Sequence, residues 1–144
     1  MTYSASFLTD ADVNLIGLQA HLQQLGIPAE VDDDNDLRVR TPAGRIIVRL
    51  LQDSRLLLFK DVYSFRADAG VLQRLQLINR MNREAMLPRF LEVDQDDDGT
   101  LLVAEYGMSY EHGLIPNQFA WVLQQFAHQT SSLLRQWDTD DLVE

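Results

Sequence analysis

Apolar residues recur along the chain with two periods, and these periods predict helices separated by groups of strands. Leucines at intervals of three and four residues predict an amphipathic helix over residues 9–25, with Ile16 widening the stripe. They are Leu15, Leu18, Leu22 and Leu25. Thr9 is the expected N-cap, and Gly26 followed by Pro28 ends the element.

The next segment changes to period two. In "LRVRT", Leu37 and Val39 alternate with Arg38 and Arg40, which predicts a strand with one apolar face. "AEV" before it and "RIIVRLL" and "LLLFKDVYSF" after it are also extended, with turns at "TPAGR" and "QDSR". Since the connections are too short for a parallel crossover, we expect an antiparallel meander of three to four strands.

Two more helices enclose a hairpin. Residues 69–86 return to helical spacing, and we expect one face to carry Leu72, Leu75, Ile78, Asn79, Asn82 and Met86. "RFLEVD" and "TLLVAEYGMS" are strands. Pro116 opens the last helix, whose apolar stripe consists of Phe119, Val122, Leu123, Phe126, Leu133, Leu134 and Trp137.

The element order is therefore α-β-β-β-α-β-β-α. It predicts an α+β fold with helices on one face of an antiparallel sheet. The 144 residues fit one domain spanning residues 1–144, and we expect the acidic end, residues 138–144, to be flexible.

The charge narrows the set of partners. The formal net charge is −10, so the protein as a whole repels nucleic acid and anionic membranes. The chain has no cysteine, no apolar run long enough to span a membrane, and no secretory signal pattern at its start. We expect a cytoplasmic protein.

Residues 94–105, "DQDDDGTLLVAE", match the calcium-loop pattern at every specified position. Asp94, Asp96 and Asp98 would be ligands, and Glu105 would close the site. The flanking segments alternate like strands, however, and an extended chain would place Glu105 about 20 Å from Gly99. We therefore predict a hairpin tip at the Asp-Gly turn. A cation-responsive regulator that binds calcium through this loop is the alternative, including a weaker site built from the three aspartates alone.

No set of residues assembles a nucleophile, a base and an oxyanion donor, so the sequence predicts a non-enzyme without a cofactor. The three histidines, His21, His112 and His128, lack metal-ligand spacing, and we expect surface or partly buried positions for them. Asn79 and Asn82 share a helix face. We expect both amides to tie this helix to neighbouring backbone; the alternative is a polar site at the mouth of a groove.

The segments "LINRMNRE", "PRFLEVDQDDDGTLLVAEYGM" and "EHGLIPNQF" resemble the YbjN family of bacterial proteins. One departure is that Arg80 and Met81 occupy the place where similar sequences often carry a large aromatic residue between the two asparagines. The resemblance implies a fold like that of type III secretion chaperones, which are small acidic homodimers that bind a segment of another protein. It also implies a role in sensory transduction or stress regulation, with no defined reaction.

The leading hypothesis is thus a homodimeric, chaperone-like adaptor that binds another protein or peptide. If Leu37 and Val39 face the helices, then Arg38 and Arg40 face outward, joined by Arg49, and this basic stripe would take an acidic segment. Nucleic-acid binding would require a dimer that groups the arginines. Trp121 lies away from the centre of the last helix's apolar stripe, so we expect it either at a dimer interface or under the loop "YGMSYEHGL".

Overall fold

The computed structural model describes residues 7–144, which form three helices and one six-stranded sheet. A 3-10 turn, Asp10–Asp12, precedes helix α1 (Leu15–Gln24). The strands β1 (Ala29–Val31), β2 (Leu37–Thr41), β3 (Gly44–Leu51) and β4 (Leu56–Ser64) follow, then helix α2 (Val71–Glu84). Strands β5 (Arg89–Asp94) and β6 (Thr100–Ser109) flank a 3-10 turn at Asp96–Asp98, and α3 (Pro116–Trp137) closes the chain.

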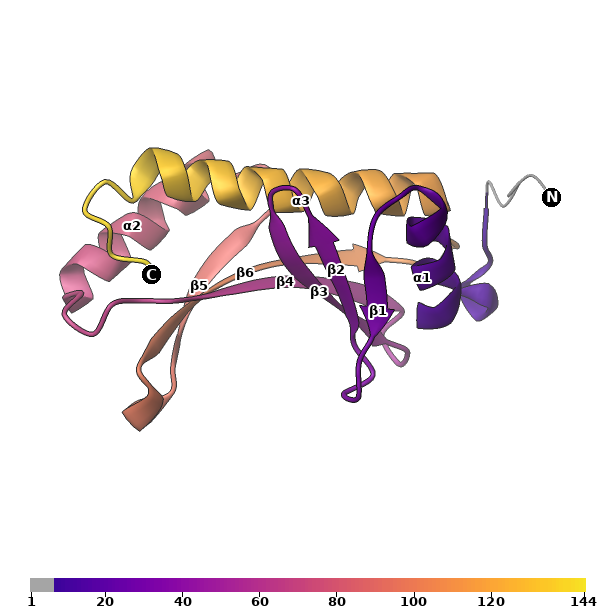
Figure 1. Cartoon of the computed structure of the whole chain (residues 1–144), viewed down its shortest axis with the longest axis horizontal. Coiled ribbons are helices and arrows are strands. Elements are labelled where there is room, and N and C mark those ends of the chain that lie inside the picture. The colour runs from indigo at the N-terminus through magenta and orange to yellow at the C-terminus, as the bar shows by residue number, and fades with distance from the viewer. Residues whose placement is uncertain (1–6) are drawn as a thin grey trace.

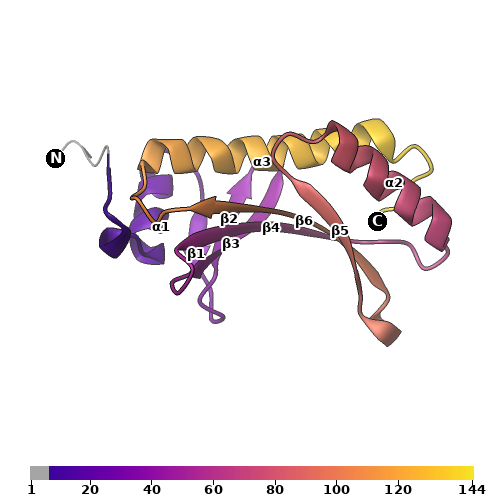
Figure 2. The same cartoon turned by 180° about the vertical axis from the view of Figure 1, so that it is seen from behind.

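Every strand pairing is antiparallel, and the order across the sheet is β1-β2-β3-β4-β6-β5. Helix α3 runs along the sheet, α2 lies beside the C-terminal half of α3, and α1 lies at the β1 end (Figure 1). In the reverse view α2 and α3 again lie on one side of the strands, and no described helix covers the other side (Figure 2). The α+β prediction is confirmed, with β1 as a short fourth strand of the meander.

The core lies between α3 and the sheet. Phe59 of β4 is fully buried, and its ring packs edge-on against Phe119 and Phe126 of α3, with centroids 5.8 and 6.0 Å apart. Leu37 and Val39 of β2 are buried on the same face, because successive side chains of a strand point to opposite sides. One face of each central strand therefore supplies the core, and the other is available for a different role.

The first helix begins later than predicted. Asn14, rather than Thr9, is the N-cap: its Oδ1 accepts a hydrogen bond from the Gly17 N–H at 2.8 Å. Val13 before it is extended and buried, which interrupts the helix that the leucine spacing suggested. Ile16, expected on the apolar stripe, is exposed.

The buried face of α2 also differs from the prediction. Leu77, Ile78 and Met81 face the core, whereas Leu72 is 67% exposed and Met86 86% exposed. Leu75 and Asn79 are exposed as well, so of the residues expected to share this face only Ile78 is buried. The helix carries apolar residues on two sides, and helical spacing alone cannot decide which side the fold covers.

The acidic C-terminal segment is packed against the fold, which corrects the expectation of a flexible tail. Val143 forms a β-bridge with Phe65, and Leu142 is buried. The Asp138 carboxylate accepts the backbone N–H groups of both residues, at 2.8 Å from Leu142 and 3.0 Å from Val143. The two apolar side chains hold the segment to the domain despite its charge.

Candidate binding surface on the open sheet face

Strand alternation places a row of arginines on the face of the sheet that α3 does not cover. Arg38 and Arg40 of β2 are exposed between buried Leu37, Val39 and Thr41. Arg49 of β3 is exposed in the same way. The three arginines named by the sequence therefore do lie on one side, but their electrostatic surroundings differ.

The acidic loop between β1 and β2 pairs with two of these arginines. Arg38 Nε lies 2.6 Å from Asp32 Oδ2, and Arg49 binds Asp36 through two hydrogen bonds of 3.0 Å each. Backbone hydrogen bonding from Asp36 is the largest cause that lowers the pKa of Asp32, and Arg38 lowers it further. These two arginines thus hold the "DDDND" loop against the sheet and have their charges matched.

Arg40 has a different neighbour. The turn at Pro42 and Ala43 joins β2 to β3, and the resulting register sets Arg40 directly opposite Arg45. Within residues 7–144 neither arginine forms an ion pair or a side-chain hydrogen bond. Like charges facing each other across two strands repel, so this pair would gain from an anion.

Sequence reasoning named Arg40 but missed Arg45. The signal was available in "RTPAGR", since a two-residue turn pairs the residues equidistant from it. Among the arginines on this face, Arg38 and Arg49 have carboxylate partners, whereas Arg40 and Arg45 carry unmatched charge.

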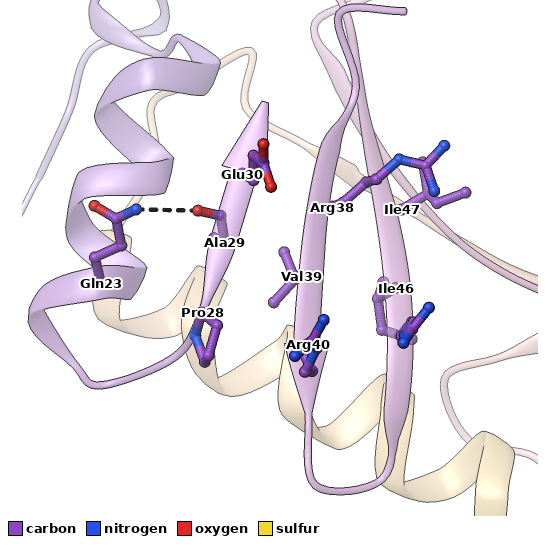
Figure 3. A pocket seen from close by; sticks show the side chains of 10 residues that line it. Gln23, Pro28, Ala29, Glu30, Arg38, Val39, Arg40, Ile46 and Ile47 are labelled. Atoms are coloured by element: carbon purple, nitrogen blue, oxygen red, sulfur yellow. Dashed lines mark hydrogen bonds between the residues drawn. The ribbon is translucent and has the colours of Figure 1, made fainter. Parts of the chain in front are cut away.

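The arginine pair borders a cavity of about 350 Å³ at the β1 end of the open face. Its lining also includes Glu30, Arg38 and Ile47, which Figure 3 shows on the first three strands, with Gln23 of α1 to one side. Gln23 of α1 closes one side, where its Nε2 donates a 3.0 Å hydrogen bond to the Ala29 carbonyl (Figure 3). The site can hold a carboxylate-bearing group between guanidinium groups, a charge-assisted contact.

An apolar band crosses the rest of the open face. The pairings Val62↔Val103 and Leu91↔Val103 bring aliphatic side chains of β4, β6 and β5 side by side. Val62 is 44% exposed and Val93 is also exposed. The open face therefore offers apolar contact next to the charged cavity.

At each edge of the sheet, a helix side chain binds the backbone of one strand residue. Asn82 of α2 binds the outer edge of β5: its Nδ2 donates to the Phe90 carbonyl at 2.9 Å, and the Phe90 N–H donates to its Oδ1 at 2.7 Å. Gln23 plays the corresponding role on β1. The predicted contact between helix amide and strand backbone is present for Asn82, whereas Asn79 makes no hydrogen bond within residues 7–144.

The aspartate-rich segment is a hairpin tip, as predicted. Asp94 ends β5, its Oδ1 accepts the Asp96 N–H at 3.0 Å, and Gly99 adopts a φ of 91°. Glu105 lies within β6 opposite Arg89, with which it forms an ion pair, so it does not close the loop. In the described part of the chain, no three acidic or histidine residues lie close enough to hold a metal ion, and the calcium alternative has no geometric support.

Trp121 is 60% exposed on α3, so it does not pack under the loop of residues 106–114.

Of the three histidines, His21 is buried. Burial lowers the pKa of His21, and hydrogen bonding to Asn117 and Pro116 opposes this shift. His112 and His128 are exposed. No helix within residues 7–144 has the length and hydropathy to span a membrane.

Comparison with known proteins agrees with this architecture. The crystal structure of YbjN from E. coli, described as "a putative transcription regulator", superposes with a TM-score of 0.80 at 22% identity, covering 95% of this chain and 98% of that one. No curated protein sequence matches. A model of the family described as "YbjN: Putative bacterial sensory transduction regulator" matches residues 15–137. The chain therefore belongs to the YbjN family.

Proposed function

We propose that this protein is a non-enzymatic, protein-binding module of bacterial regulation. It acts in the cytoplasm as a chaperone-like adaptor in a stress response and holds an acidic segment of a partner protein on the open sheet face. The observation that carries the proposal is the facing pair Arg40 and Arg45, unpaired beside a cavity and next to an apolar band.

A local cationic site is compatible with a net charge of −10. Exposed charges act over a screening length of about 8 Å at physiological salt, so Arg40 and Arg45 dominate at contact distance. The neighbouring Arg38 and Arg49 already have carboxylate partners, which leaves the pair as the anchor for an incoming acidic side chain.

The partner segment lies across the open face and does not extend the sheet. Asn82 occupies the outward N–H and C=O of Phe90 on β5, and Gln23 occupies the outward C=O of Ala29 on β1. Strand addition needs such free backbone groups at an edge. A partner segment that lies across the open face binds through its side chains, which contact the apolar band and the charged cavity and require no free backbone groups of the sheet.

A peptide titration tests the anchor. The probe is a fluorescent twelve-residue peptide of alternating leucine and glutamate, compared with the same peptide carrying lysine in place of glutamate. We expect the glutamate peptide to bind and the lysine peptide not to bind. Replacing Arg40 and Arg45 together by Ser should weaken binding by at least about tenfold, since two charge-assisted contacts are lost.

The matched control replaces Arg49 and Arg89 by Ser, which are paired with Asp36 and Glu105 and do not line the cavity. It removes the same formal charge from the same face but leaves the unpaired arginines in place, so binding should change much less. An equal loss of peptide affinity in both double variants would show that only the overall charge matters, and would reject Arg40 and Arg45 as the anchor. Affinity purification from the native host, read by mass spectrometry, would then name the partner.

The proposal includes a homodimer. Its interface is the exposed face of α2, where the first turns carry the exposed apolar residues Val71, Leu72 and Leu75, and Met86 just beyond the helix is also exposed. A two-fold dimer would bury these residues against their own copies. Trp121, the position favoured by the sequence, is exposed on α3 and offers the rival interface.

Light scattering at micromolar concentration distinguishes these surfaces. We expect twice the mass of one chain for the native protein, and one chain for Leu72→Ser combined with Leu75→Ser. Trp121→Ser should remain dimeric. A native mass of one chain, unchanged on concentrating, would reject the dimer, and dissociation by Trp121→Ser alone would move the interface to α3.

A further inference from the structure

A second cavity, of about 560 Å³, lies on the helix-covered side of the sheet. It is bounded by the β2–β3 turn, by β4 and by the C-terminal part of α3 with the segment that follows it. The Asp61 carboxylate of β4 lies at its floor, and Tyr63 lies beside it. Neither residue belongs to the proposed peptide surface.

Asp61 is a buried carboxylate without a cation. Its side chain is on the core face and the residue is only 8% exposed. Oδ2 accepts a 2.5 Å hydrogen bond from the Tyr63 hydroxyl, and within residues 7–144 no Arg, Lys or His lies within ion-pair distance. By contrast, Glu92 of β5 and Glu105 of β6 each have an arginine partner.

The approach to this carboxylate is open. Gly44 lies against it: a Cβ at that position would come 3.7 Å from Asp61 Oδ2, so a larger side chain there would fill the entrance. Ala43, Leu134 and Val143 supply apolar walls of the cavity. A ligand would therefore meet hydrocarbon on its sides and a carboxylate at its end.

The remaining charged groups around the cavity favour a cation. Arg45 and Arg135 lie on the rim together with Asp138, Asp141 and Glu144. Asp138 is already engaged by two backbone N–H groups, which leaves Asp141 and Glu144 to offset the two arginines. Asp61 then remains as the unmatched charge at the floor. An anion would be repelled there, and a divalent metal ion lacks a sufficient set of oxygen ligands among the described residues.

We propose that this cavity binds the ammonium group of a primary alkyl amine, whose N–H groups donate to Asp61 while its chain packs against Ala43, Leu134 and Val143. Asp61 lies outside the Arg40–Arg45 anchor, although Arg45 lies at the edge of both cavities. The same chemistry has two sources, a free small amine or a lysine side chain of another protein, and the test has an arm for each.

The probes are butylammonium, 1,4-diaminobutane and an unstructured peptide with a single lysine, with 1-butanol as the uncharged control. Binding is read from the carboxyl ¹³C resonance of Asp61 and by calorimetry. We expect at least one ammonium probe to shift that resonance and 1-butanol not to. Butylammonium alone would assign a free amine, and the peptide alone a lysine of a partner.

Two variants separate the site from general charge. Asp61→Asn keeps the shape and an acceptor for Tyr63, and should abolish amine binding, whereas Asp53→Asn in an exposed turn should not alter it. Since burial raises the pKa of Asp61 to about 6, the affinity should be about tenfold weaker at pH 5 than at pH 7. Unchanged binding by a folded Asp61→Asn protein, or no resonance shift with 100-fold excess of any ammonium probe, would overturn the proposal.

Discussion

The two faces of the sheet are built from the same strands but have different roles. On the covered face, side chains such as Leu37, Phe59 and Leu102 are fully buried beneath the helices. On the open face, their immediate neighbours Arg38, Leu58 and Leu101 remain partly or largely in contact with solvent. Because adjacent residues of a strand point to opposite faces, one residue of each adjacent pair stabilises the fold and the other is available for recognition.

Each face also contains one group that does not fit its role. Asp61 is a carboxylate on the buried face, and Arg45 is a cation set opposite another cation on the open face. Residues that lower the stability of a fold indicate a function, because a protein that retains them accepts a loss of stability. Substitutions on the two faces should therefore change the free energy of unfolding by different amounts. At Asp61 and Arg45 the change should also have the opposite sign, a gain in stability.

The largest effect is expected in the core. Phe59→Ala should lower the free energy of unfolding by about 3 to 5 kcal/mol, because it empties the space between two rings of α3. Val62→Ala, three residues away on the open face, should cost less than about 1 kcal/mol. Urea unfolding followed by circular dichroism measures both, and similar losses would contradict the division between the faces.

Asp61→Asn should stabilise the protein at neutral pH. Burial raises the pKa of Asp61 from 3.8 to about 6, so the folded state holds this proton more tightly than the unfolded state. The carboxyl's contribution to stability is complete below pH 3.8 and is lost as the pH rises through 6. The substitution should then raise the free energy of unfolding by up to roughly 3 kcal/mol at pH 7.5.

The same substitution should have little effect at pH 4, where the native carboxyl is protonated and resembles the amide. Urea unfolding from pH 4 to pH 8 measures this difference. A gain in stability that does not depend on pH would show that packing, and not ionisation, is responsible.

The two asparagines of α2 give a smaller, paired test. Asn82→Ala should lower the free energy of unfolding by about 1 to 2 kcal/mol, because two hydrogen bonds to Phe90 are lost and the edge of β5 becomes free. Asn79→Ala should stay within about 0.5 kcal/mol. Increased aggregation of the Asn82 variant alone, seen by light scattering, would support its role at the edge; equal behaviour of both variants would reject it.

The smallest effect concerns the arginines, and its sign is informative. Arg45→Ser should raise the free energy of unfolding by a few tenths of a kcal/mol, roughly 0.2 to 1, because it removes a like-charge pair. Arg49→Ser should lower it, since buried Asp36 loses its bidentate partner. Thermal unfolding at low salt compares the two, and a loss of stability on replacing Arg45 would indicate a partner for it within the fold.

Local patterns in the sequence were sufficient for much of the architecture. The alternation in "LRVRT", the short turns and the stripe of the last helix each depend on residues close together in the chain. They determined an antiparallel sheet with helices on one face. The same local reasoning identified the tip of residues 94–105 as a hairpin despite its calcium-loop pattern, because strand-like flanks cannot return Glu105 to the turn.

Only the tertiary structure decided which side of α2 is buried, which arginines are matched by carboxylates, and that Asp61 lies at the floor of a cavity. Each of these depends on distances between segments far apart in sequence. A helix with apolar residues on two sides has the same spacing of apolar residues whichever side is buried. Whether a charged side chain has an ion-pair partner depends on a loop that is distant in sequence and folds against it. The periods of the sequence thus determined the elements, whereas packing between distant elements determined the candidate sites.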